Sequence, residues 1–399
     1  MNRRVYRDGA LADGRDDRLR LGISILVEDG RITWIRPTDD EGPIGDAGAV
    51  EVIDASGSTI VPGMVDAHSH LTMPGGAHWI DRGSDPTDRL LDVAEANARL
   101  LTEAGVRWAR DVGSVRREDP DVNGRERALA LVARDRWRAR PSYPHVRAAG
   151  TWIMARGLMP ALSVEAADGD ELLAAAAGQL DDGADLVKLY LDGPDLDTSP
   201  WSVDELRAVV AAVHARGARV TAHSGSIAGA RAGAEAGIDA IEHGFELDED
   251  LAATMVRNAV RLVSTLSVMA SWRTFATTTN LPRFTSADGR ARTEARRERA
   301  FASVAIAHRA GVAISTGTDF GGGSTRANQL AWEVEQLVDA GLQPWEALGC
   351  ATWRGGELLG EPDGGVIREG GPADFALVHG DPVSDPTALW RVWHVAWAG

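Results

Sequence analysis

The chain has 399 residues and a formal net charge of −17, from 42 basic and 59 acidic side chains, and 44% of its residues are hydrophobic. This composition is ordinary for a globular protein and excludes a disordered chain, a collagen and a coiled coil. The acidic balance argues against a nucleic-acid partner, because a phosphate backbone is bound by a basic surface.

The single cysteine, Cys350, excludes an internal disulfide and a cysteine metal cluster, and it fits a reducing compartment. The charged N-terminus has no apolar run behind it, so we see no secretion signal. No stretch approaches the roughly 18 apolar residues of a membrane span. We therefore expect a cytoplasmic protein without a membrane partner.

Both ends of the chain carry short apolar runs that are typical of strands. These runs lie at residues 23–27, 31–35, 365–367, 373–378 and 391–397. The first two flank Gly30, which can adopt the positive φ of a tight turn, so they predict a β-hairpin. Two strand-rich ends around a long middle predict one small β-sandwich domain formed by residues 1–61 and 360–399.

The middle of the chain, residues 62–359, alternates short apolar runs with alanine-rich amphipathic stretches. The apolar runs are Met64–His68, Val106–Val112, Val146–Gly150, Leu186–Leu191, Val220–His223, Ala240–His243, Leu262–Leu266 and Val312–Asp319. The helical stretches between them include residues 88–104, 170–181, 203–216 and 290–310. Repeated strand–helix units predict an α/β fold, a (β/α)8 barrel, whose active site lies at the carboxyl ends of the strands.

A doubly wound sheet is the alternative fold for such an alternation. It would have a glycine-rich phosphate-binding turn after an early strand. Here the glycine-rich segment at residues 321–324 follows the last predicted strand, which favours the barrel.

Metal-binding side chains stand at the ends of four predicted strands. His68 and His70 close the first strand with one residue between them, so both can face the barrel mouth. His223 ends the fifth strand, His243 the sixth and Asp319 the eighth. Imidazole and carboxylate groups at the same end of a barrel predict a divalent metal site.

Lys188 ends the fourth predicted strand and is the only lysine among the 42 basic residues. Arginine fills most cationic roles equally well, but it does not lose its proton at neutral pH. The lysine therefore indicates chemistry that needs a neutral amine, either a carbamate formed with CO2 or a Schiff base. A Schiff base would leave the histidines and Asp319 without a role, whereas the two carbamate oxygens can bridge two metal ions.

Taken together, these residues resemble the amidohydrolase superfamily, in the branch that holds imidazolonepropionase-like and prolidase-like enzymes. The resemblance covers nearly the whole chain, including the segment Ile60–His70, the barrel and the closing segment Gly365–Phe375.

The resemblance implies a hydrolase that cleaves an amide bond of a small molecule, such as an N-acyl amino acid or a dipeptide-like substrate. Two divalent ions, commonly zinc in this family, would lower the pKa of a bridging water, and Asp319 would act as base and then acid. The implied ligands are His68, His70 and Asp319 for one ion, His223 and His243 for the other, and carboxylated Lys188 between them.

The loop after the third strand departs from the family pattern. Many members carry a Thr-Gly-Gly-His-Gly type sequence there, but residues 151–160 contain no histidine, so a dipeptidase specificity does not transfer directly. The tryptophan and methionines of this loop predict a more apolar pocket. Candidate substrate-binding residues near strand ends are Trp152, Tyr190, His78 and Arg273, and Trp79 and Trp272 are candidate lining residues.

Several alternatives stay open from the sequence. Within the superfamily, the chain could be a cyclic amide hydrolase or a deaminase, although deaminases usually use one ion and lack the strand-four lysine. A silent scaffold protein would have no reason to keep a buried polar cluster. A Schiff-base lyase would need no metal. The tryptophan-rich exterior is compatible with a homo-oligomer.

Overall fold

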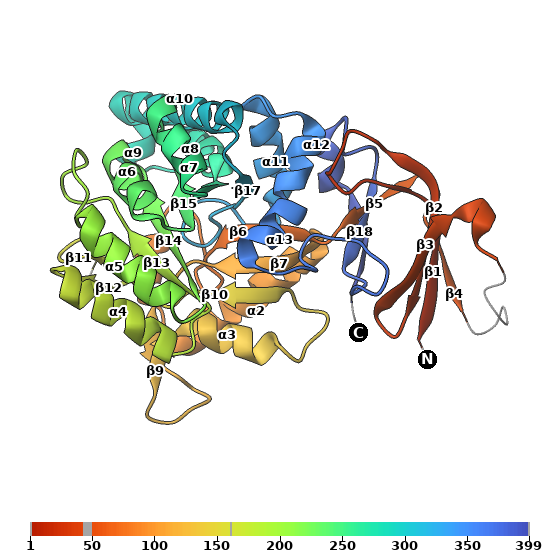
Figure 1. Cartoon of the computed structure of the whole chain (residues 1–399), viewed down its shortest axis with the longest axis horizontal. Coiled ribbons are helices and arrows are strands. Elements are labelled where there is room, and N and C mark those ends of the chain that lie inside the picture. The colour runs from red at the N-terminus through yellow and green to blue at the C-terminus, as the bar shows by residue number, and fades with distance from the viewer. Residues whose placement is uncertain (1, 43–49, 160–161, 398–399) are drawn as a thin grey trace.

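The computed structural model describes residues 2–42, 50–159 and 162–397 (Figure 1). The predicted domain ranges also include residues 1, 43–49, 398 and 399, and the predicted apolar loop includes residue 160. These positions lie outside the described residues.

Both ends of the chain contribute to one seven-stranded sheet on the right of Figure 1. Its strands are β1 (Arg3–Leu11), β2 (Arg20–Glu28), β3 (Arg31–Pro37), β4 (Glu51–Asp54), β5 (Ser58–Pro62), β18 (Phe375–His379) and β19 (Val392–Ala396). The strand order is β19-β18-β5-β1-β2-β3, with β4 paired to β1. The predicted hairpin is confirmed, because β2 and β3 are joined through Asp29 and Gly30, which both have positive φ.

The prediction for the terminal strands is wrong at residues 365–367, which form a loop. Gly365 has a φ of 66°, and a Cβ added to it would lie 2.2 Å from the carbonyl carbon of Thr352. This left-handed, tightly packed backbone is incompatible with an extended strand. The pairings of the described residues give one sheet here and not two facing sheets, so the β-sandwich stays a prediction.

Parallel strands form the middle of the chain, as predicted for an α/β fold. Each predicted apolar run overlaps one of them: β6 (Met64–Ser69), β7 (Val106–Asp111), β10 (His145–Ala148), β13 (Leu186–Tyr190), β14 (Arg219–Ser224), β15 (Ala240–His243), β16 (Arg261–Ser264) and β17 (Ile314–Thr316). One sheet holds β6, β7 and β10. A second holds β13 to β17 together with β11 (Trp152–Ala155) and β12 (Ser163–Ala166).

Two isolated parallel bridges connect these two sheets. Ser69 at the end of β6 pairs with Phe320 after β17, and Ala149 after β10 pairs with Leu186 of β13. Helices cover the outside of the strands (Figure 1). The helices of the described residues are α1 (Trp79–Arg82), α2 (Thr87–Glu103), α3 (Leu129–Trp137), α4 (Gly169–Asp181), α5 (Val203–His214), α6 (Ile227–Ala236), α7 (Glu249–Arg257), α8 (Leu266–Thr278), α9 (Pro282–Thr285), α10 (Ala287–Ala310), α11 (Leu330–Asp339), α12 (Pro344–Cys350) and α13 (Trp353–Leu359). The smaller elements are β8 (Arg116–Glu118), β9 (Glu126–Ala128), η1 (Thr38–Asp40) and η2 (Pro386–Trp390).

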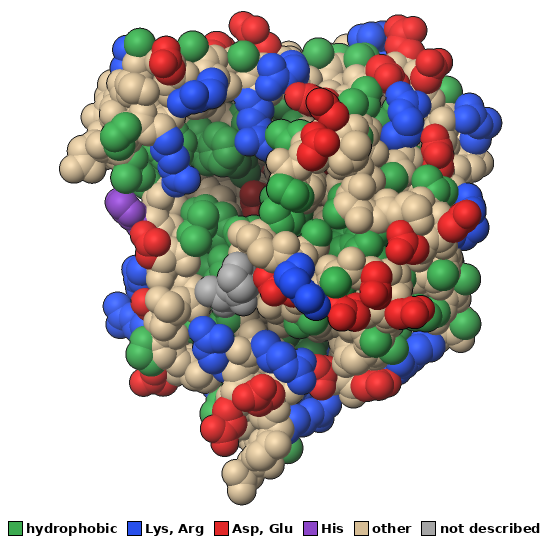
Figure 2. All heavy atoms as spheres, turned by 90° about the vertical axis from the view of Figure 1, so that its left-hand side faces the viewer, with side chains coloured by type: hydrophobic (Ala, Val, Ile, Leu, Met, Phe, Trp, Pro, Cys, Tyr) green, Lys and Arg blue, Asp and Glu red, His purple; other side chains and the backbone are tan. Residues whose placement is uncertain are grey.

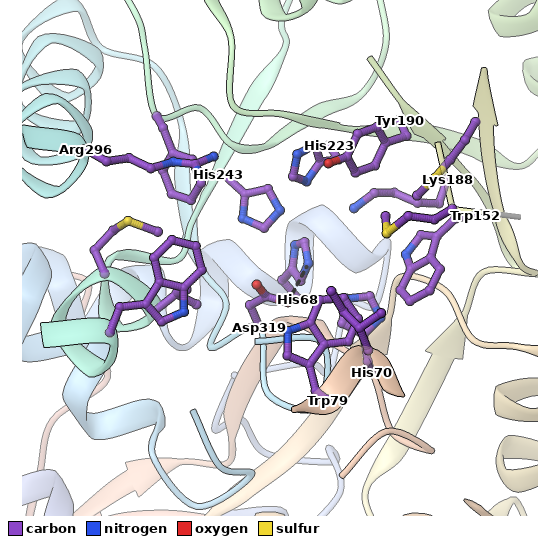
Figure 3. A pocket seen from close by; sticks show the side chains of 18 residues that line it. His68, His70, Trp79, Trp152, Lys188, Tyr190, His223, His243, Arg296 and Asp319 are labelled. Atoms are coloured by element: carbon purple, nitrogen blue, oxygen red, sulfur yellow. Dashed lines mark ion pairs between the residues drawn. The ribbon is translucent and has the colours of Figure 1, made fainter. Parts of the chain in front are cut away.

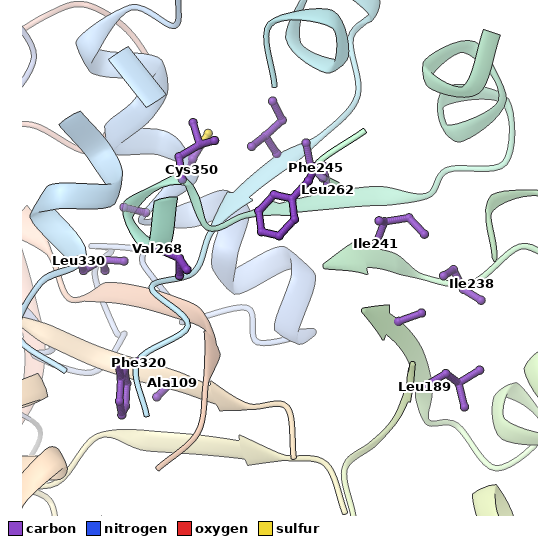
Figure 4. Packing of buried hydrophobic residues seen from close by; sticks show 14 of the residues in the cluster. Ala109, Leu189, Ile238, Ile241, Phe245, Leu262, Val268, Phe320, Leu330 and Cys350 are labelled. Carbon is purple, nitrogen blue, oxygen red and sulfur yellow. The ribbon is translucent and has the colours of Figure 1, made fainter. Parts of the chain in front are cut away.

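The core lies between the strands and these helices, and Figure 4 shows part of it around Leu189, Ile241 and Leu262. Because successive side chains of a strand point to opposite faces, β13 can bury Val187 and Leu189 in this core and turn Lys188 the other way. Burial of the apolar residues of a strand therefore fixes the direction of the polar residue that stands between them in the sequence. Among the described residues, no helix has the length and apolar character needed to cross a membrane.

A buried ion pair joins the terminal sheet to the parallel strands. Asp374, next to β18, accepts hydrogen bonds from Arg107 Nε of β7 at 3.0 Å and from His145 Nε2 of β10 at 2.8 Å. The Arg107 side chain is fully buried, with 0% exposure. Burial favours the neutral acid, but the hydrogen bond from His145 and the charge of Arg107 hold the pKa of Asp374 below its usual value.

Candidate metal centre and active site

A cavity of about 240 Å³ opens at the carboxyl ends of the parallel strands. Figure 2 faces this side of the molecule and shows a hollow whose walls are largely hydrophobic. The polar residues His68, His70, Lys188, His223, His243 and Asp319 all line this cavity, as Figure 3 shows. The structure thus brings together every residue that the sequence proposed as a metal ligand.

His68 and His70 each have one ring nitrogen fixed by a hydrogen bond. His68 Nδ1–H donates to Glu242 Oε2 at 2.7 Å, and His70 Nδ1–H donates to the carbonyl oxygen of Gly113 at 2.7 Å. The Nε2 atoms that remain lie 3.5 and 3.3 Å from Oδ1 of Asp319. Such outer hydrogen bonds orient an imidazole for metal binding, with the other nitrogen as the ligand.

His223 and His243 follow the same pattern. His223 uses Nε2 to bond Asp192 Oδ2 at 3.1 Å, and His243 Nδ1 bonds Thr265 Oγ1 at 2.8 Å. The parallel register sets His223 beside Tyr190, and the two rings stack with centroids 3.9 Å apart. Burial lowers the pKa of both histidines, which keeps them in the neutral form that binds metals.

The backbone at two of these residues is strained. His243 and Asp319 have φ values of 70° and 51°, in the left-handed region that non-glycine residues seldom occupy. Each such residue costs on the order of 1–3 kcal/mol, and strain of this kind is concentrated at functional sites. Although burial favours the neutral acid, the His68 and His70 rings hold the pKa of Asp319 well below its usual range, so it is ionised.

Lys188 is buried, with 1% exposure, and its Nζ has no hydrogen-bond partner among the residues that the structure describes. Burial lowers the pKa of this amine to about 8. An unpartnered buried amine is unfavourable unless another group completes the site. Its position among four histidines and Asp319 fits a lysine that is carboxylated when metal ions are bound.

The donor set fits one or two divalent ions. Ligand atoms of His68, His243 and Asp319 lie within 4.8 Å of one another. The ring centroid of His243 is 4.5 Å from that of His223, and the ring of His68 is 5.4 Å from that of His70. Neutral imidazoles with a carboxylate are ligands that suit zinc.

Two buried acids behind the histidines were missed by the sequence analysis. Glu242 accepts hydrogen bonds from His68, Arg110 and Thr221. Burial would raise the pKa of Glu242, but the charges of Arg110 and Lys188 hold it well below its usual value. The sequence does mark Glu242, because it is a charged residue inside the apolar run of β15. Asp192, which forms a hydrogen bond with His223, follows β13 and has no comparable feature in the sequence.

Trp152 and Tyr190 line the cavity, as the sequence predicted, together with the anticipated Trp79 and Trp272. His78 and Arg273 lie elsewhere. The His78 side chain is 62% exposed and faces Asp81, and Arg273 pairs with Glu294 at 3.2 Å. Neighbouring residues on a helix point in different directions, so Trp79 and Trp272 face the cavity while the residues beside them do not.

Arg296 was not predicted, yet it is one of the residues that line the cavity. It lies in the middle of α10, far from any strand end, where the sequence offers no signal that distinguishes it from the other arginines of that helix. The remaining walls are mostly apolar and include Met154, Phe245 and Met269.

The model of the amidohydrolase family matches residues 59–396, and the chain belongs to this family. It is therefore a hydrolase of carbon–nitrogen bonds, and the family resemblance seen in the sequence is confirmed.

Among similar proteins, an uncharacterized protein of Mycobacterium tuberculosis is 32% identical over 376 residues, which cover 92% of this chain and 88% of that protein. Among similar structures, a Xaa-Pro dipeptidase with bound methionine in the active site has a TM-score of 0.82 at 23% identity, covering 99% of this chain and 98% of the other. Aspergillus niger ochratoxinase has a TM-score of 0.80 at 20% identity, with 99% and 94% covered. At these identities the two structures show the fold.

Proposed function

We propose that the chain is a binuclear metal-dependent amidohydrolase that cleaves an amide bond of a small molecule. The observation that carries this proposal is the unpartnered amine of Lys188, buried among four histidines that each have one ring nitrogen already fixed by the protein. We also propose that the parallel strands close into an eight-stranded barrel. The bridges of Ser69 with Phe320 and of Ala149 with Leu186 support this closure.

The proposed ligands divide into two groups. His68, His70 and Asp319 would hold one ion, His223 and His243 the other, and carboxylated Lys188 would hold both. The neutral Lys188 amine forms an N–C bond with CO2 and releases one proton, which leaves a carbamate anion. Two divalent ions bound there, zinc by donor type, supply electrophilic activation and allow water to ionise at neutral pH.

The residues of the chain provide the remaining chemistry. Asp319 is ionised and adjoins the proposed centre, so it accepts the proton of the attacking water and then gives it to the leaving nitrogen. Burial raises the pKa of Tyr190 to about 12, so its hydroxyl stays protonated and can donate to the oxyanion that forms. The apolar walls exclude bulk water, which strengthens these electrostatic interactions.

The substrate that this cavity favours is an N-acyl amino acid or a dipeptide-like amide with an apolar group. The walls formed by Trp79, Trp152, Phe245 and Trp272 support an apolar or aromatic group. The similar structures of a Xaa-Pro dipeptidase and an ochratoxinase are consistent with amide cleavage on this fold.

The test begins with metal analysis of protein produced with added zinc, which should give close to two ions per chain. The loaded protein is then screened against N-acetyl amino acids, dipeptides and lactams, with amine release as the readout. Asp319→Asn should keep much of its zinc yet lose roughly 10²- to 10⁴-fold in rate, as expected when a general acid–base group is removed. Asp81→Asn, at an exposed acid on α1, is the matched control.

One ion or none per chain would contradict the binuclear proposal, and a normal rate for Asp319→Asn would remove this residue as the proton carrier. Hydrolysis of lactams alone would assign the chain to the cyclic amide hydrolases.

A further inference from the structure

Arg296 places a positive charge in the otherwise apolar part of the cavity. Its guanidinium carbon lies 4.9 Å from the ring centroid of Phe245 and 5.7 Å from that of Trp272. Figure 3 shows Arg296 entering the cavity from the side opposite Lys188 and Trp152. Aromatic faces hold a guanidinium in position, but they do not use its hydrogen-bond donors.

No carboxylate in the described ranges forms an ion pair with Arg296, although two acids are close enough to influence it. Asp192 is occupied: its Oδ2 accepts from His223 Nε2 at 3.1 Å and from the Gly225 amide at 2.9 Å. The other oxygen of Asp192 accepts from Ser224 and Ser226. Glu246, the second acid, pairs with Arg299 at 2.9 Å.

Arg296 thus differs from the arginines of the chain that pair with an acid, such as Arg299 with Glu246. Burial lowers the pKa of its guanidinium, but arginine keeps its charge at any physiological pH. A charge partly withdrawn from water without a partner is unfavourable in the free protein. It becomes favourable when an anion enters the cavity, because the guanidinium fork binds a carboxylate through two parallel hydrogen bonds.

We propose that Arg296 binds a free carboxylate of the substrate, so that the enzyme acts on amides that carry one carboxylate and an apolar or aromatic group. This inference rests on the proposed function for the reaction, and it adds the residue that recognises the substrate carboxylate and makes that carboxylate a requirement. The carboxylate belongs either to the amine half, as in an N-acyl amino acid, or to the acyl half, as in a succinamate.

Binding is tested with zinc-loaded protein and three probes: N-acetyl-L-phenylalanine, N-benzylsuccinamate and the neutral N-acetyl-L-phenylalaninamide. Tryptophan fluorescence reports binding, because Trp79, Trp152 and Trp272 line the cavity. The variants are Arg296→Met, which keeps the contact with Phe245 and Trp272 but has no charge, and Arg296→Lys. Arg309→Met, on the exposed last turn of α10, is the matched control.

We expect at least one carboxylate probe to bind the wild type about 10- to 100-fold more tightly than the neutral amide, as for a hydrogen-bonded charge pair. Arg296→Met should remove this preference and leave the affinity for the neutral amide unchanged. Arg296→Lys should restore part of the preference, and Arg309→Met should behave as the wild type. The carboxylate probe with the larger loss in Arg296→Met identifies the half that carries the charge.

The inference is overturned if the wild type binds no carboxylate probe or does not prefer it, or if Arg296→Met binds it as tightly as the wild type. The last outcome would show that the zinc ions alone hold the carboxylate. The same probes separate this inference from the proposed reaction. If the wild type prefers a carboxylate probe but hydrolyses no amide, only the proposed reaction is contradicted. If wild type and Arg296→Met hydrolyse the carboxylate probes at equal rates, only the role of Arg296 is contradicted.

Discussion

Replacing Lys188 with methionine should stabilise the metal-free protein while it disrupts the proposed binuclear centre. In the folded chain, burial lowers the pKa of the amine to about 8, against about 10.4 for an unfolded lysine. One pKa unit corresponds to about 1.36 kcal/mol, so at neutral pH the buried amine opposes folding by about 3 kcal/mol. Methionine has a similar shape and carries no charge, and the free energy of unfolding should rise by about this amount.

The pH dependence of this effect has a definite sign. Because the pKa of Lys188 is lower in the folded chain than in the unfolded chain, its cost to the free energy of unfolding has its full size at pH values below the folded pKa of about 8. The penalty shrinks as pH rises, because the unfolded chain then also loses its proton, and it disappears above the unfolded pKa. The stability difference between Lys188→Met and the wild type should therefore be largest at pH 7 and much smaller near pH 10.

The assay is urea unfolding of chelator-treated protein in CO2-free buffer at both pH values, with Arg309→Met as the control for loss of one positive charge. Added zinc should then reverse the order, because on the proposed binuclear centre the wild type should bind close to two ions and Lys188→Met at most one. A variant less stable than the wild type at pH 7 without metal would refute the reasoning, because it would mean that the Lys188 amine is stabilised in the folded chain.

Two further substitutions test the scaffold and the site. Asp374→Asn leaves the fully buried Arg107 without its charged partner, and urea unfolding should show a loss of about 3–5 kcal/mol; a change below about 1 kcal/mol would contradict the importance of this pair. Gly322→Ala places a Cβ 2.1 Å from Cδ2 of His70, which should displace this imidazole. Zinc affinity, measured by competition with a chelator, should therefore fall about 10-fold or more. The control is Gly178→Ala, which has open space around the new Cβ and should bind zinc normally. Equal zinc affinity in both glycine variants would mean that His70 can move without losing its role.

The strands and the proposed metal ligands were predictable because their signals are local. Each strand is a short apolar run, and the side chain at the end of the run lies at the mouth of the cavity. His223 and Asp319 were found in this way. Gly365 shows the limit of the same approach, since its left-handed backbone and its close contact with Thr352 depend on packing against a residue outside the local apolar run.

The residues that line the rest of the cavity were less predictable for a geometric reason. His78 and Arg273 follow strand ends, but each lies next to a tryptophan that takes the position facing the cavity. Arg296 comes from the middle of a helix that packs over α8, so its place in the cavity depends on tertiary structure. Glu242 had a sequence signal, as an acid inside an apolar run, whereas the role of Asp192 depends on its hydrogen bond with His223, which the sequence does not indicate.

The pairing of β5 with β18 sets the order of events during protein synthesis. This ladder joins residues 58–62 to residues 375–379, which the ribosome adds more than 300 positions later. The N-terminal strands therefore leave the ribosome early, and β5 has its edge open until nearly the whole chain is made. Contacts of such long sequence separation slow folding and prolong the exposure of unpaired strand edges. The terminal sheet is thus completed only after the parallel strands have been made, and we expect the edge of β5 to be prone to non-native pairing until β18 is available.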